Sequence, residues 1–315
     1  MRARSLLVCL LQVAFPLLLL AQPLQGTDKK LLKSLQSLVT GFQGKGQLGI
    51  YIENLQTGKT VIYQADTIFP TASMIKVPIL LTLMDKIGKG ELLYHEKREY
   101  RDSLLYEGED ILGSFKQGEK IELSKLIMLM CTMSDNTASL WLQSLAGGGI
   151  RINQLLDSLG YRSTRMNSRT PGREPNRREY GWGQSSPREM ADLFKRIYRR
   201  QFLNDTLCDR MQRSLSRNYW DEEALSQVPP TVQVFSKNGA VDESRSETFL
   251  VMAPHGAYVC SVMTKNLSDT TWQSHNAAWV LARTLSHLLW ERYEPAYGWK
   301  PVMALTGNPV TDRHD

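Results

Sequence analysis

One serine precedes one lysine by three residues in the largely apolar stretch FPTASMIKVPIL. A serine hydroxyl becomes a nucleophile when a neighbouring base accepts its proton, and a lysine amine can be that base. If a helix begins near Ser73, as Pro70 favours, then Ser73 and Lys76 lie on one helix face within reach of each other. Pro78 requires that the helix either start very near Ser73 or bend. The alternative is two polar residues on the outer face of a buried helix, because about one such pair is expected by chance in a chain of this length.

Two further polar clusters occur later in the chain. The segment CTMSDNTASLWL places Ser134, Asp135 and Asn136 between two helical patterns, and FSKNGAV places Lys237 and Gly239 at the end of a strand pattern. Taken alone, the first cluster is typical of a helix N-cap, and Lys237 is typical of a solvated strand lysine. Taken in chain order, the three clusters form the pattern Ser-x-x-Lys, Ser-Asp-Asn and Lys-x-Gly.

This ordered pattern resembles that of the class A β-lactamases and penicillin-binding proteins. The resemblance to the class A β-lactamase family covers the chain from Lys29 to Trp290. It implies an α/β (α+β) fold of the β-lactamase/transpeptidase type. In that fold an antiparallel sheet built from both chain ends is flanked by helices and carries an all-helical inserted lobe.

The resemblance also implies catalytic roles. Ser73 would be the acylated nucleophile, and Lys76 would take its proton directly or through water. Ser134 would relay a proton to the leaving nitrogen, with the charge of Lys237 near that nitrogen and near the substrate carboxylate. Asn136 would hydrogen-bond the acylamide side chain of the substrate.

Further binding residues follow from the same resemblance. The backbone amides of Ser73 and Ala240 would form an oxyanion hole. Arg245 resembles the family arginine that binds the substrate carboxylate, and a surface arginine is an equal alternative. The Lys-x-Gly triplet departs from the family because Asn238, before Gly239, stands where the family has Thr or Ser.

The deacylation base is the least clear residue. Class A enzymes carry a loop glutamate, followed by Pro and shortly by Asn, that activates the hydrolytic water. The sequence Glu-Pro-Asn at Glu174 is similar but compressed, and aligning Arg169 on the family's loop arginine would put Pro171 at the glutamate position. Glu174 is the candidate base and Glu179 the reserve. If neither reaches the acyl ester, Ser73 would acylate and then stall.

Hydrophobic periodicity predicts the elements that would position these residues. Helical spacing of apolar residues indicates helices at 28–39, 123–133, 137–145, 150–159, 186–194, 204–215 and 272–290. Alternation indicates strands at 47–54, 60–65, 231–237, 246–254 and 257–264. Residues 161–184 lack periodicity, which is typical of a long loop that is functional or disordered. A sheet formed by both chain ends around a helical insertion is therefore expected.

The composition and the first residues indicate an exported globular protein. Of the 315 residues, 42% are apolar and 22% are charged. Arg2 and Arg4 precede an apolar run and a small-residue site, which is the order of a secretory signal. A membrane anchor is the alternative, but the run is shorter than the ~20 residues that span a bilayer and contains Pro16. We expect a signal peptide at 1–21, a catalytic domain at 22–292, an irregular tail at 293–315, and a secreted or periplasmic location without a stable membrane anchor.

Charge, cysteines and histidines argue against other classes. Loss of the two signal arginines lowers the formal charge from +6 to +4, and the basic residues are dispersed, so no nucleic-acid partner is expected. Cys131, Cys208 and Cys260 allow at most one internal disulfide and are expected in the core. The five histidines lack the spacing of a zinc site, so neither a metal nor a cofactor is expected.

The lead hypothesis is an exported, monomeric serine β-lactamase acting on a small-molecule β-lactam or an acyl-peptide-like substrate. One alternative is a related serine hydrolase that cleaves D-Ala-D-Ala peptides or esters. Another is a penicillin-binding or sensor protein that keeps the acyl group.

Overall fold

The computed structural model describes residues 24–108, 110–216, 218–301 and 303–307. The expected signal peptide, 1–21, lies outside the described residues. Among the described residues, no helix is both long and apolar enough to cross a membrane.

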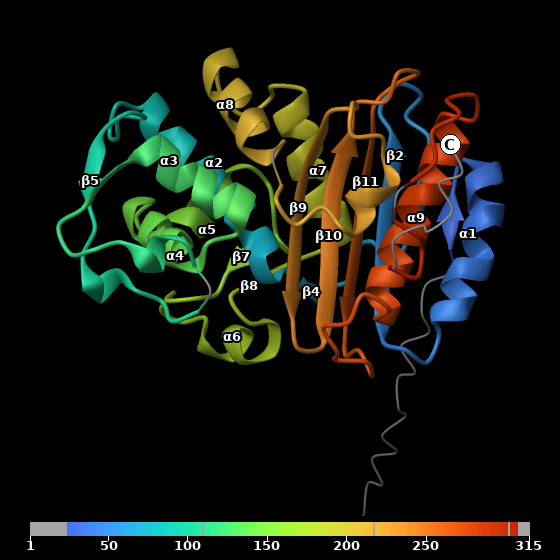
Figure 1. The fold of residues 1–315 in the computed structure, drawn as a ribbon, viewed down its shortest axis with the longest axis horizontal. Coiled ribbons are helices and arrows are strands. Elements are labelled where there is room, and N and C mark those ends of the chain that lie inside the picture. Colours follow the sequence, from blue (N-terminus) through green and yellow to red (C-terminus); the bar gives the residue numbers. More distant parts are fainter. Residues whose placement is uncertain (1–23, 109, 217, 302, 308–315) are drawn as a thin grey trace, which may run out of the picture.

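A six-stranded antiparallel sheet forms the centre of the molecule (Figure 1). Its order is β1-β3-β2-β11-β10-β9, so the strands of the N-terminal part join those of the C-terminal part where β2 pairs with β11. The strand bounds are β1 Gln25–Gly26, β2 Gln47–Asn54, β3 Thr60–Tyr63, β9 Val234–Val241, β10 Ser244–Val251 and β11 Tyr258–Lys265. The prediction of a sheet built from both chain ends is confirmed.

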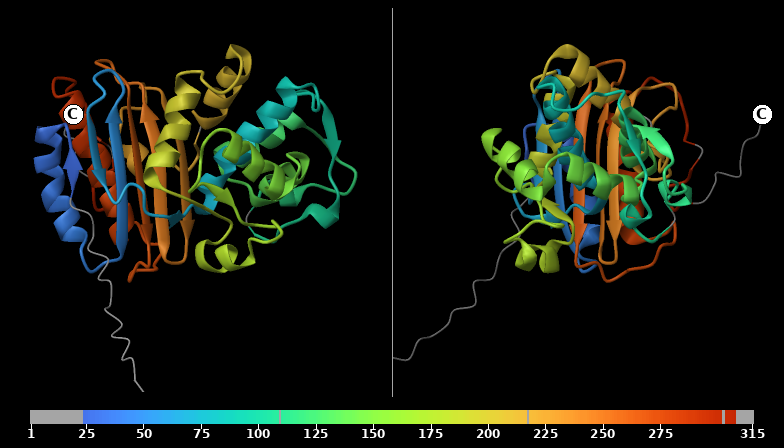
Figure 2. Two further views of the ribbon diagram at one scale, coloured as in Figure 1. Left: turned by 180° about the vertical axis from the view of Figure 1, so that it is seen from behind. Right: turned by 90° about the vertical axis from the view of Figure 1, so that its left-hand side faces the viewer.

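Helices cover both faces of this sheet. On one face lie α1 (Lys29–Phe42) and α9 (Ala277–Tyr293), packed side by side. On the other face α7 (Pro187–Tyr198) contacts β2, β10 and β11, and α8 (Asp205–Leu215) contacts β9 (Figure 2). Ile50 and Leu285 belong to the core under α9, where both are fully buried. The sheet therefore has two buried faces and a core on each side.

The helical lobe stands beside strand β9 (Figure 1). Its helices are α2 Lys76–Gly88, α3 Leu123–Met128, α4 Asn136–Leu145 and α5 Gly148–Ser158. Every residue of α2 from Lys76 to Asp85 is buried, because α4, α5 and α8 pack around this helix. Two small sheets complete the lobe, β4-β8-β7 (Phe69–Pro70, Gly183–Ser185, Arg165–Met166) and β5-β6 (Lys97–Glu99, Lys120–Glu122).

Two predicted elements differ from the structure. The stretch at 161–184 is not without structure, because it contains β7, the start of β8 and the helix α6, Glu174–Tyr180. Helix α6 buries none of its residues, which explains why no hydrophobic periodicity signalled it. Helix α9 begins at Ala277 instead of residue 272, since the Asn276 side chain accepts a hydrogen bond from the Ala278 amide as N-cap.

The three cysteines of the described chain are free and buried. Burial raises the pKa of the Cys131 thiol to about 12, so it is not a thiolate at neutral pH. The interpretation of Cys131, Cys208 and Cys260 as core residues is confirmed.

Candidate active site

The nucleophile candidate lies where the sheet meets the helical lobe. After β4 the chain forms a 3-10 turn, Ala72–Ile75, that continues directly into α2. Pro78 is then the third residue of α2, in the first turn. Backbone N–H groups in a first turn have no acceptor within the helix, so a proline costs no helical hydrogen bond there. Of the two expected arrangements, the structure therefore has the helix start near Ser73. The Ser73 Oγ and the Lys76 Nζ are 3.0 Å apart.

The Lys76 ammonium group is the centre of a polar cluster. Its Nζ lies 3.0 Å from the Ser134 Oγ and 2.9 Å from the Asn136 Oδ1, and it also donates to the Ser134 carbonyl. Burial, followed by the positive charge of Lys237, lowers the pKa of Lys76 well below its ordinary value. The neutral amine is therefore accessible, and in that form it can accept the proton of the Ser73 hydroxyl.

Ser134 occupies a strained position between two helices. A π-helical turn, Leu129–Met133, ends at Ser134, whose φ of 60° is in the left-handed region. Such a conformation costs about 1–2 kcal/mol for a residue with a Cβ. The Asp135 carboxylate holds it in place by accepting from the Ala138 amide at 2.7 Å and the Leu112 amide at 2.8 Å. Asp135 is thus the N-cap of α4, as predicted for this cluster taken alone, whereas the side chains of Ser134 and Asn136 contact the Lys76 Nζ.

Strand β9 brings the third cluster against the 3-10 turn. A Cβ at Gly239 would lie 2.2 Å from the Thr71 carbonyl oxygen and 2.9 Å from the Ser73 nitrogen, so only glycine permits this approach. Lys237 is fully buried, and its Nζ donates to the carbonyl and to the Oδ1 of Asn238, both at 3.0 Å. Burial lowers the pKa of Lys237 to about 8. Asn238 is therefore a fixed acceptor for the second lysine.

The geometry fits the predicted oxyanion hole. Ser73 is the second residue of the 3-10 turn, so its N–H has no acceptor within that turn. Ala240 follows Gly239 on β9 and lines the same cavities as Ser73. Two amides beside the nucleophile are the donors that a developing oxyanion requires.

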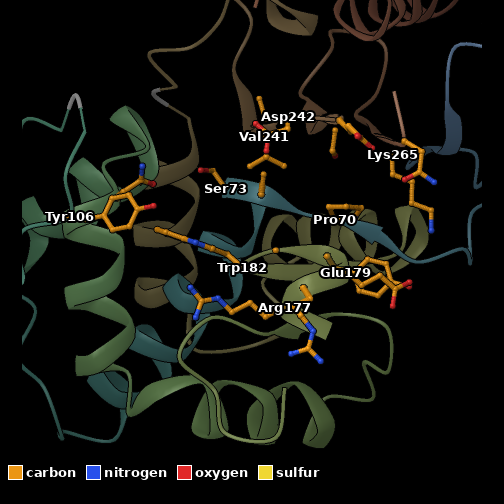
Figure 3. Close-up of a pocket in the computed structure, with 18 residues that line it drawn as sticks. Pro70, Ser73, Tyr106, Arg177, Glu179, Trp182, Val241, Asp242 and Lys265 are labelled. Carbon is orange, nitrogen blue, oxygen red and sulfur yellow. The ribbon is translucent and has the colours of Figure 1, made fainter. Parts of the chain in front are cut away.

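Two cavities meet at Ser73. The loop-side cleft, of about 560 Å³, lies between the nucleophile turn and residues 177–182 (Figure 3). Two of its lining residues, Tyr106 and Trp182, have rings that meet edge to face with centroids 5.3 Å apart. The helix-side cavity, of about 490 Å³, lies between the β9–β10 edge of the sheet and the start of α9. Both are lined by Ser73, Asn136 and Ala240.

The structure does not bring Glu174 to Ser73. Glu174 opens α6, is exposed, and accepts a hydrogen bond from the Gly172 amide at 3.2 Å. It lines neither cavity. Glu179 lines the loop-side cleft, but its side chain points away from Ser73 in Figure 3. The assignment of Glu174 as deacylation base stays a prediction without geometric support.

The segment before Glu174 is packed against α5. Thr170 is buried, and its hydroxyl donates to the Ser168 carbonyl at 2.9 Å. A Cβ at Gly149 of α5 would lie 1.7 Å from the Thr170 Oγ1, so α5 and the loop are in close contact there. This packing leaves no room for a longer side chain at residue 170 without movement of α5 or the loop.

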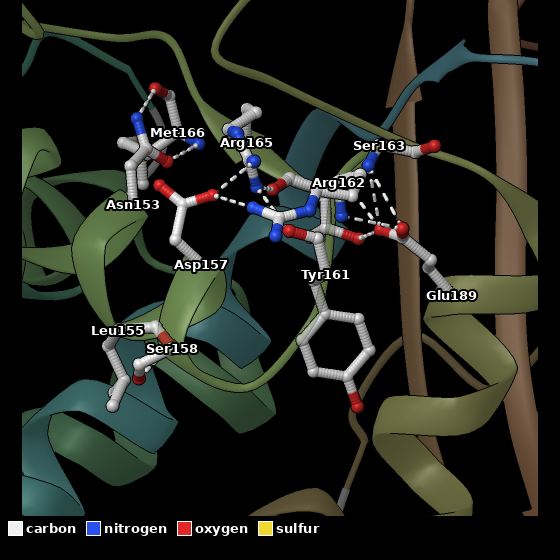
Figure 4. A network of polar contacts seen from close by, with 11 residues as sticks. Asn153, Leu155, Asp157, Ser158, Tyr161, Arg162, Ser163, Arg165, Met166 and Glu189 are labelled. Atoms are coloured by element: carbon white, nitrogen blue, oxygen red, sulfur yellow. Dashed lines mark hydrogen bonds and ion pairs between the residues drawn. The ribbon is translucent and has the colours of Figure 1, made fainter.

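Polar contacts fix both ends of this loop, and Figure 4 shows those at its start. At its start, the Glu189 carboxylate accepts from the Ser163 and Thr164 amides, and Asp157 pairs with Arg165 at 2.6 Å. Further along, the Arg173 guanidinium donates to the side chains of Asn167 and Gln184. Several loop arginines are therefore used to hold the loop, whereas Arg177 and Arg178 line the cleft.

Arg245 reaches the helix-side cavity with its guanidinium already engaged. Its two Nη atoms donate to five backbone carbonyls, those of Val241, Asp242, Ser244, Thr270 and Thr271. The guanidinium carbon also lies 4.3 Å from the centre of the Trp272 ring and 5.1 Å from that of Trp279. These contacts tie the β9–β10 turn to the segment before α9, which favours a structural role for Arg245.

Sequence reasoning missed several lining residues. Tyr106 and Trp182 of the loop-side cleft, and Trp272 and Trp279 of the helix-side cavity, belong to no motif. Glu247 also lines the helix-side cavity. A signal for Glu247 was present, because it is the one charged residue in the strand segment SETFLV.

The chain is similar to known β-lactamases. A family model described as "Beta-lactamase enzyme family" matches residues 30–293. A β-lactamase of Streptomyces fradiae is 27% identical over 227 residues, which cover 67% of this chain and 70% of that protein. A β-lactamase of Streptomyces albus G is 28% identical over 189 residues, and the match spans 54% of each chain.

Solved structures are similar over most of the chain. The structure of PBP-A has a TM-score of 0.74 and 25% identity, with 85% of this chain and 97% of that chain covered. A mutant of PBP-A, described as an acyl-enzyme complex with penicillin G, matches with the same TM-score of 0.74. A class A β-lactamase from Mycobacterium abscessus shares the fold, with a TM-score of 0.72 and 21% identity over 83% of this chain and 98% of that chain.

Proposed function

Because this chain belongs to the Beta-lactamase enzyme family, we propose that it is a serine β-lactamase that opens the amide of a β-lactam through an acyl-enzyme on Ser73. One observation carries this proposal. The Nζ of Lys76, a buried lysine with a lowered pKa, lies 3.0 Å from both the Ser73 Oγ and the Ser134 Oγ. A single amine can therefore take a proton from the nucleophile and return it towards the leaving group.

Acylation proceeds through three proton transfers. The neutral Lys76 amine accepts the Ser73 hydroxyl proton while the Ser73 Oγ attacks the lactam carbonyl carbon. The carbonyl oxygen becomes an oxyanion held by the amides of Ser73 and Ala240. The C–N bond then breaks as the Ser134 hydroxyl donates its proton to the lactam nitrogen, and Lys76 returns a proton to Ser134.

Charge and hydrogen bonds orient the substrate. The protonated Lys237, buried on β9, attracts the substrate carboxylate by its charge. Its hydrogen bonds to Asn238 keep the ammonium in one place, so Asn238 supports binding through Lys237. Asn136, which lines both cavities, hydrogen-bonds the acylamide group of the substrate.

A second candidate is a penicillin-binding hydrolase of D-Ala-D-Ala peptides or esters that releases β-lactams slowly. The position of Glu174, exposed and outside both cavities, favours it. Acylation uses Lys76 and is unaffected by this position, whereas deacylation needs a base beside a water molecule. With a β-lactam as substrate, the two candidates therefore differ in how long the acyl group stays on Ser73.

One time course tests both candidates. The protein lacking residues 1–21 is mixed with a chromogenic cephalosporin, and turnover is followed by absorbance and the acyl group by intact-protein mass. A serine β-lactamase turns over many equivalents, and Ser73→Ala abolishes both turnover and adduct. A stable adduct with little turnover supports the second candidate. Equal turnover in the wild type and Ser73→Ala contradicts both.

We also propose that residues 1–21 direct export to the periplasm or medium and are then removed, and that the mature protein is a monomer. The order of charged, apolar and small residues at the N-terminus supports export. The monomeric state is what the resemblance to the class A family implies. Fractionation of expressing bacteria, with N-terminal sequencing of the mature protein and its mass by light scattering, tests these points. An increase in β-lactam resistance of the host would accompany export of an active enzyme.

A further inference from the structure

The helix-side cavity extends well beyond the residues that perform the acylation. It begins at Ser73 and Ser134 and continues past Asn238 to Trp279 and Ala282 of α9. In the proposed mechanism Ser134 protonates the leaving nitrogen, so this cavity lies on the leaving-group side of the scissile bond. The loop-side cleft, in contrast, would hold the acyl side.

Glu247 stands in this cavity with an unused oxygen. It is paired across the sheet with Asn238, and only 3% of its surface is exposed. Its Oε2 accepts a hydrogen bond from the Ala224 amide at 3.2 Å, whereas its Oε1 is buried and has no partner among the described residues. Burying a carboxyl oxygen without a hydrogen-bond partner costs desolvation free energy. A hydrogen-bond donor or a cation that enters the cavity would therefore gain binding free energy from contact with this oxygen.

The surroundings of Glu247 carry a surplus of acidic side chains. Asp110, Glu222 and Glu223 also line the cavity, against the two guanidiniums Arg245 and Arg283. Both guanidiniums already have partners. Arg245 donates to backbone carbonyls, and Arg283 pairs with Glu223 and donates to the Leu305 carbonyl. Asp110, Glu222 and Glu247 remain, and among the described residues no cation forms an ion pair with Glu247, on which the buried Lys237 acts only as a nearby charge.

Aromatic rings complete the walls. Trp220, Trp272 and Trp279 line the cavity. The Arg245 guanidinium already lies over the Trp272 and Trp279 rings, so Trp220, which is 48% exposed, is the ring left open to a ligand. Indole faces attract planar cations, and an exposed tryptophan beside a carboxyl group is a favourable combination for them. The cavity thus offers both a counter-charge and a surface for stacking.

We propose that the helix-side cavity binds a planar, cationic substituent on the leaving-group side of the substrate, with Glu247 as its counter-charge and Trp220 as its stacking surface. This inference rests on the proposed function. Burial and the nearby Glu223 raise the pKa of Glu247, to about 8, and a bound cation would favour its ionised form.

A matched pair of cephalosporins isolates this contact. Cephalothin and cephaloridine share the thienylacetamido group at C7 and the carboxylate at C4, and they differ at C3, where cephaloridine has a pyridinium ring and cephalothin a neutral acetoxy group. The second-order acylation constant is measured for both, as kcat/KM where turnover is fast and from intact-protein mass where the adduct persists. The ratio of the two constants is compared between variants, so the different intrinsic reactivities of the drugs cancel.

Glu247→Gln keeps an oxygen for the Ala224 amide and removes the charge. We expect the cephaloridine to cephalothin ratio to fall at least about fivefold in this variant, as for the loss of one close charge pair. The matched control is Glu243→Gln, an exposed carboxylate of the loop-side cleft, which should leave the ratio unchanged. If Glu247→Gln does not fold, Glu222→Lys reverses a charge at the cavity rim and should lower the ratio in the same direction.

The outcomes separate the two proposals. If both drugs acylate Ser73 and the ratio is the same in wild type, Glu247→Gln and Glu222→Lys, the cation site is refuted and the proposed function stands. If neither drug acylates Ser73, the proposed function fails and the inference that rests on it fails too. A ratio that falls in Glu247→Gln and Glu222→Lys but not in Glu243→Gln supports the site.

Discussion

Replacing Lys237 by arginine should shift the alkaline limb of the pH profile of acylation. Lys237 must be charged to attract the substrate carboxylate, and burial lowers its pKa to about 8. With that value, about nine-tenths of Lys237 is protonated at pH 7 and about one-tenth at pH 9. The wild-type kcat/KM should therefore fall about tenfold over these two pH units. An arginine stays protonated throughout, so the variant should lose less than about twofold over the same interval.

The assay measures kcat/KM for a cephalosporin from pH 6 to pH 10 in buffers of constant ionic strength. Only the shape of each profile is compared, because the bulkier guanidinium will also lower the absolute rate. The control is Lys265→Arg, which changes another lysine lining the loop-side cleft and should keep the wild-type alkaline limb. An unchanged limb near pH 8 in Lys237→Arg would refute the assignment of this titration to Lys237. The acidic limb belongs to Lys76, whose lowered pKa makes activity fall as decreasing pH protonates its amine.

Three other substitutions test separate parts of the site. Gly239→Ala places a methyl group 2.2 Å from the Thr71 carbonyl oxygen. The acylation rate should therefore fall at least about a hundredfold, which corresponds to about 3 kcal/mol of lost transition-state stabilisation. An acylation rate within threefold of wild type, measured by stopped flow, would contradict the close approach. Asp135→Ala removes the cap of α4 and the hydrogen bond to the Leu112 amide, so the free energy of unfolding should fall by about 2 kcal/mol, measured by thermal unfolding. An unchanged unfolding midpoint would show that other contacts hold Ser134. Glu174→Gln should leave the lifetime of the acyl-enzyme unchanged in an intact-mass time course, and a lifetime at least tenfold longer would restore Glu174 as the base.

The sequence was sufficient to predict the residues that meet at the nucleophile. Ser73, Lys76, Ser134 and Asn136 form one hydrogen-bonded cluster, as their motifs predicted, because each motif marks an element boundary that the fold brings to the same place. The sheet of both chain ends was also predictable, since its strands alternate or are strongly apolar. These features depend on local residue types and spacing, which can be read from a single sequence.

Other features depended on contacts that no local pattern records. Helix α6 is fully at the surface, so its sequence lacks an apolar face, and the direction of Glu174 follows from how that helix starts. The hydrogen bonds of the Arg245 guanidinium depend on the carbonyls of residues 241, 242, 244, 270 and 271, and the last two approach Arg245 only in the folded chain. The partnerless oxygen of Glu247 is likewise a property of packing between β10 and the segment at Ala224.

The pairing of β2 with β11 has a consequence for biosynthesis. Residues 47–54 find their partners only at residues 258–265, so the register of the central sheet joins segments more than 200 residues apart. During synthesis, the N-terminal hairpin must wait for almost the entire chain before its open edge is covered. Topologies with such distant pairings fold slowly, and the nascent polypeptide therefore stays unfolded while it is being made. For a protein proposed to be exported, that delay keeps the precursor in the extended state that can pass through a translocation channel.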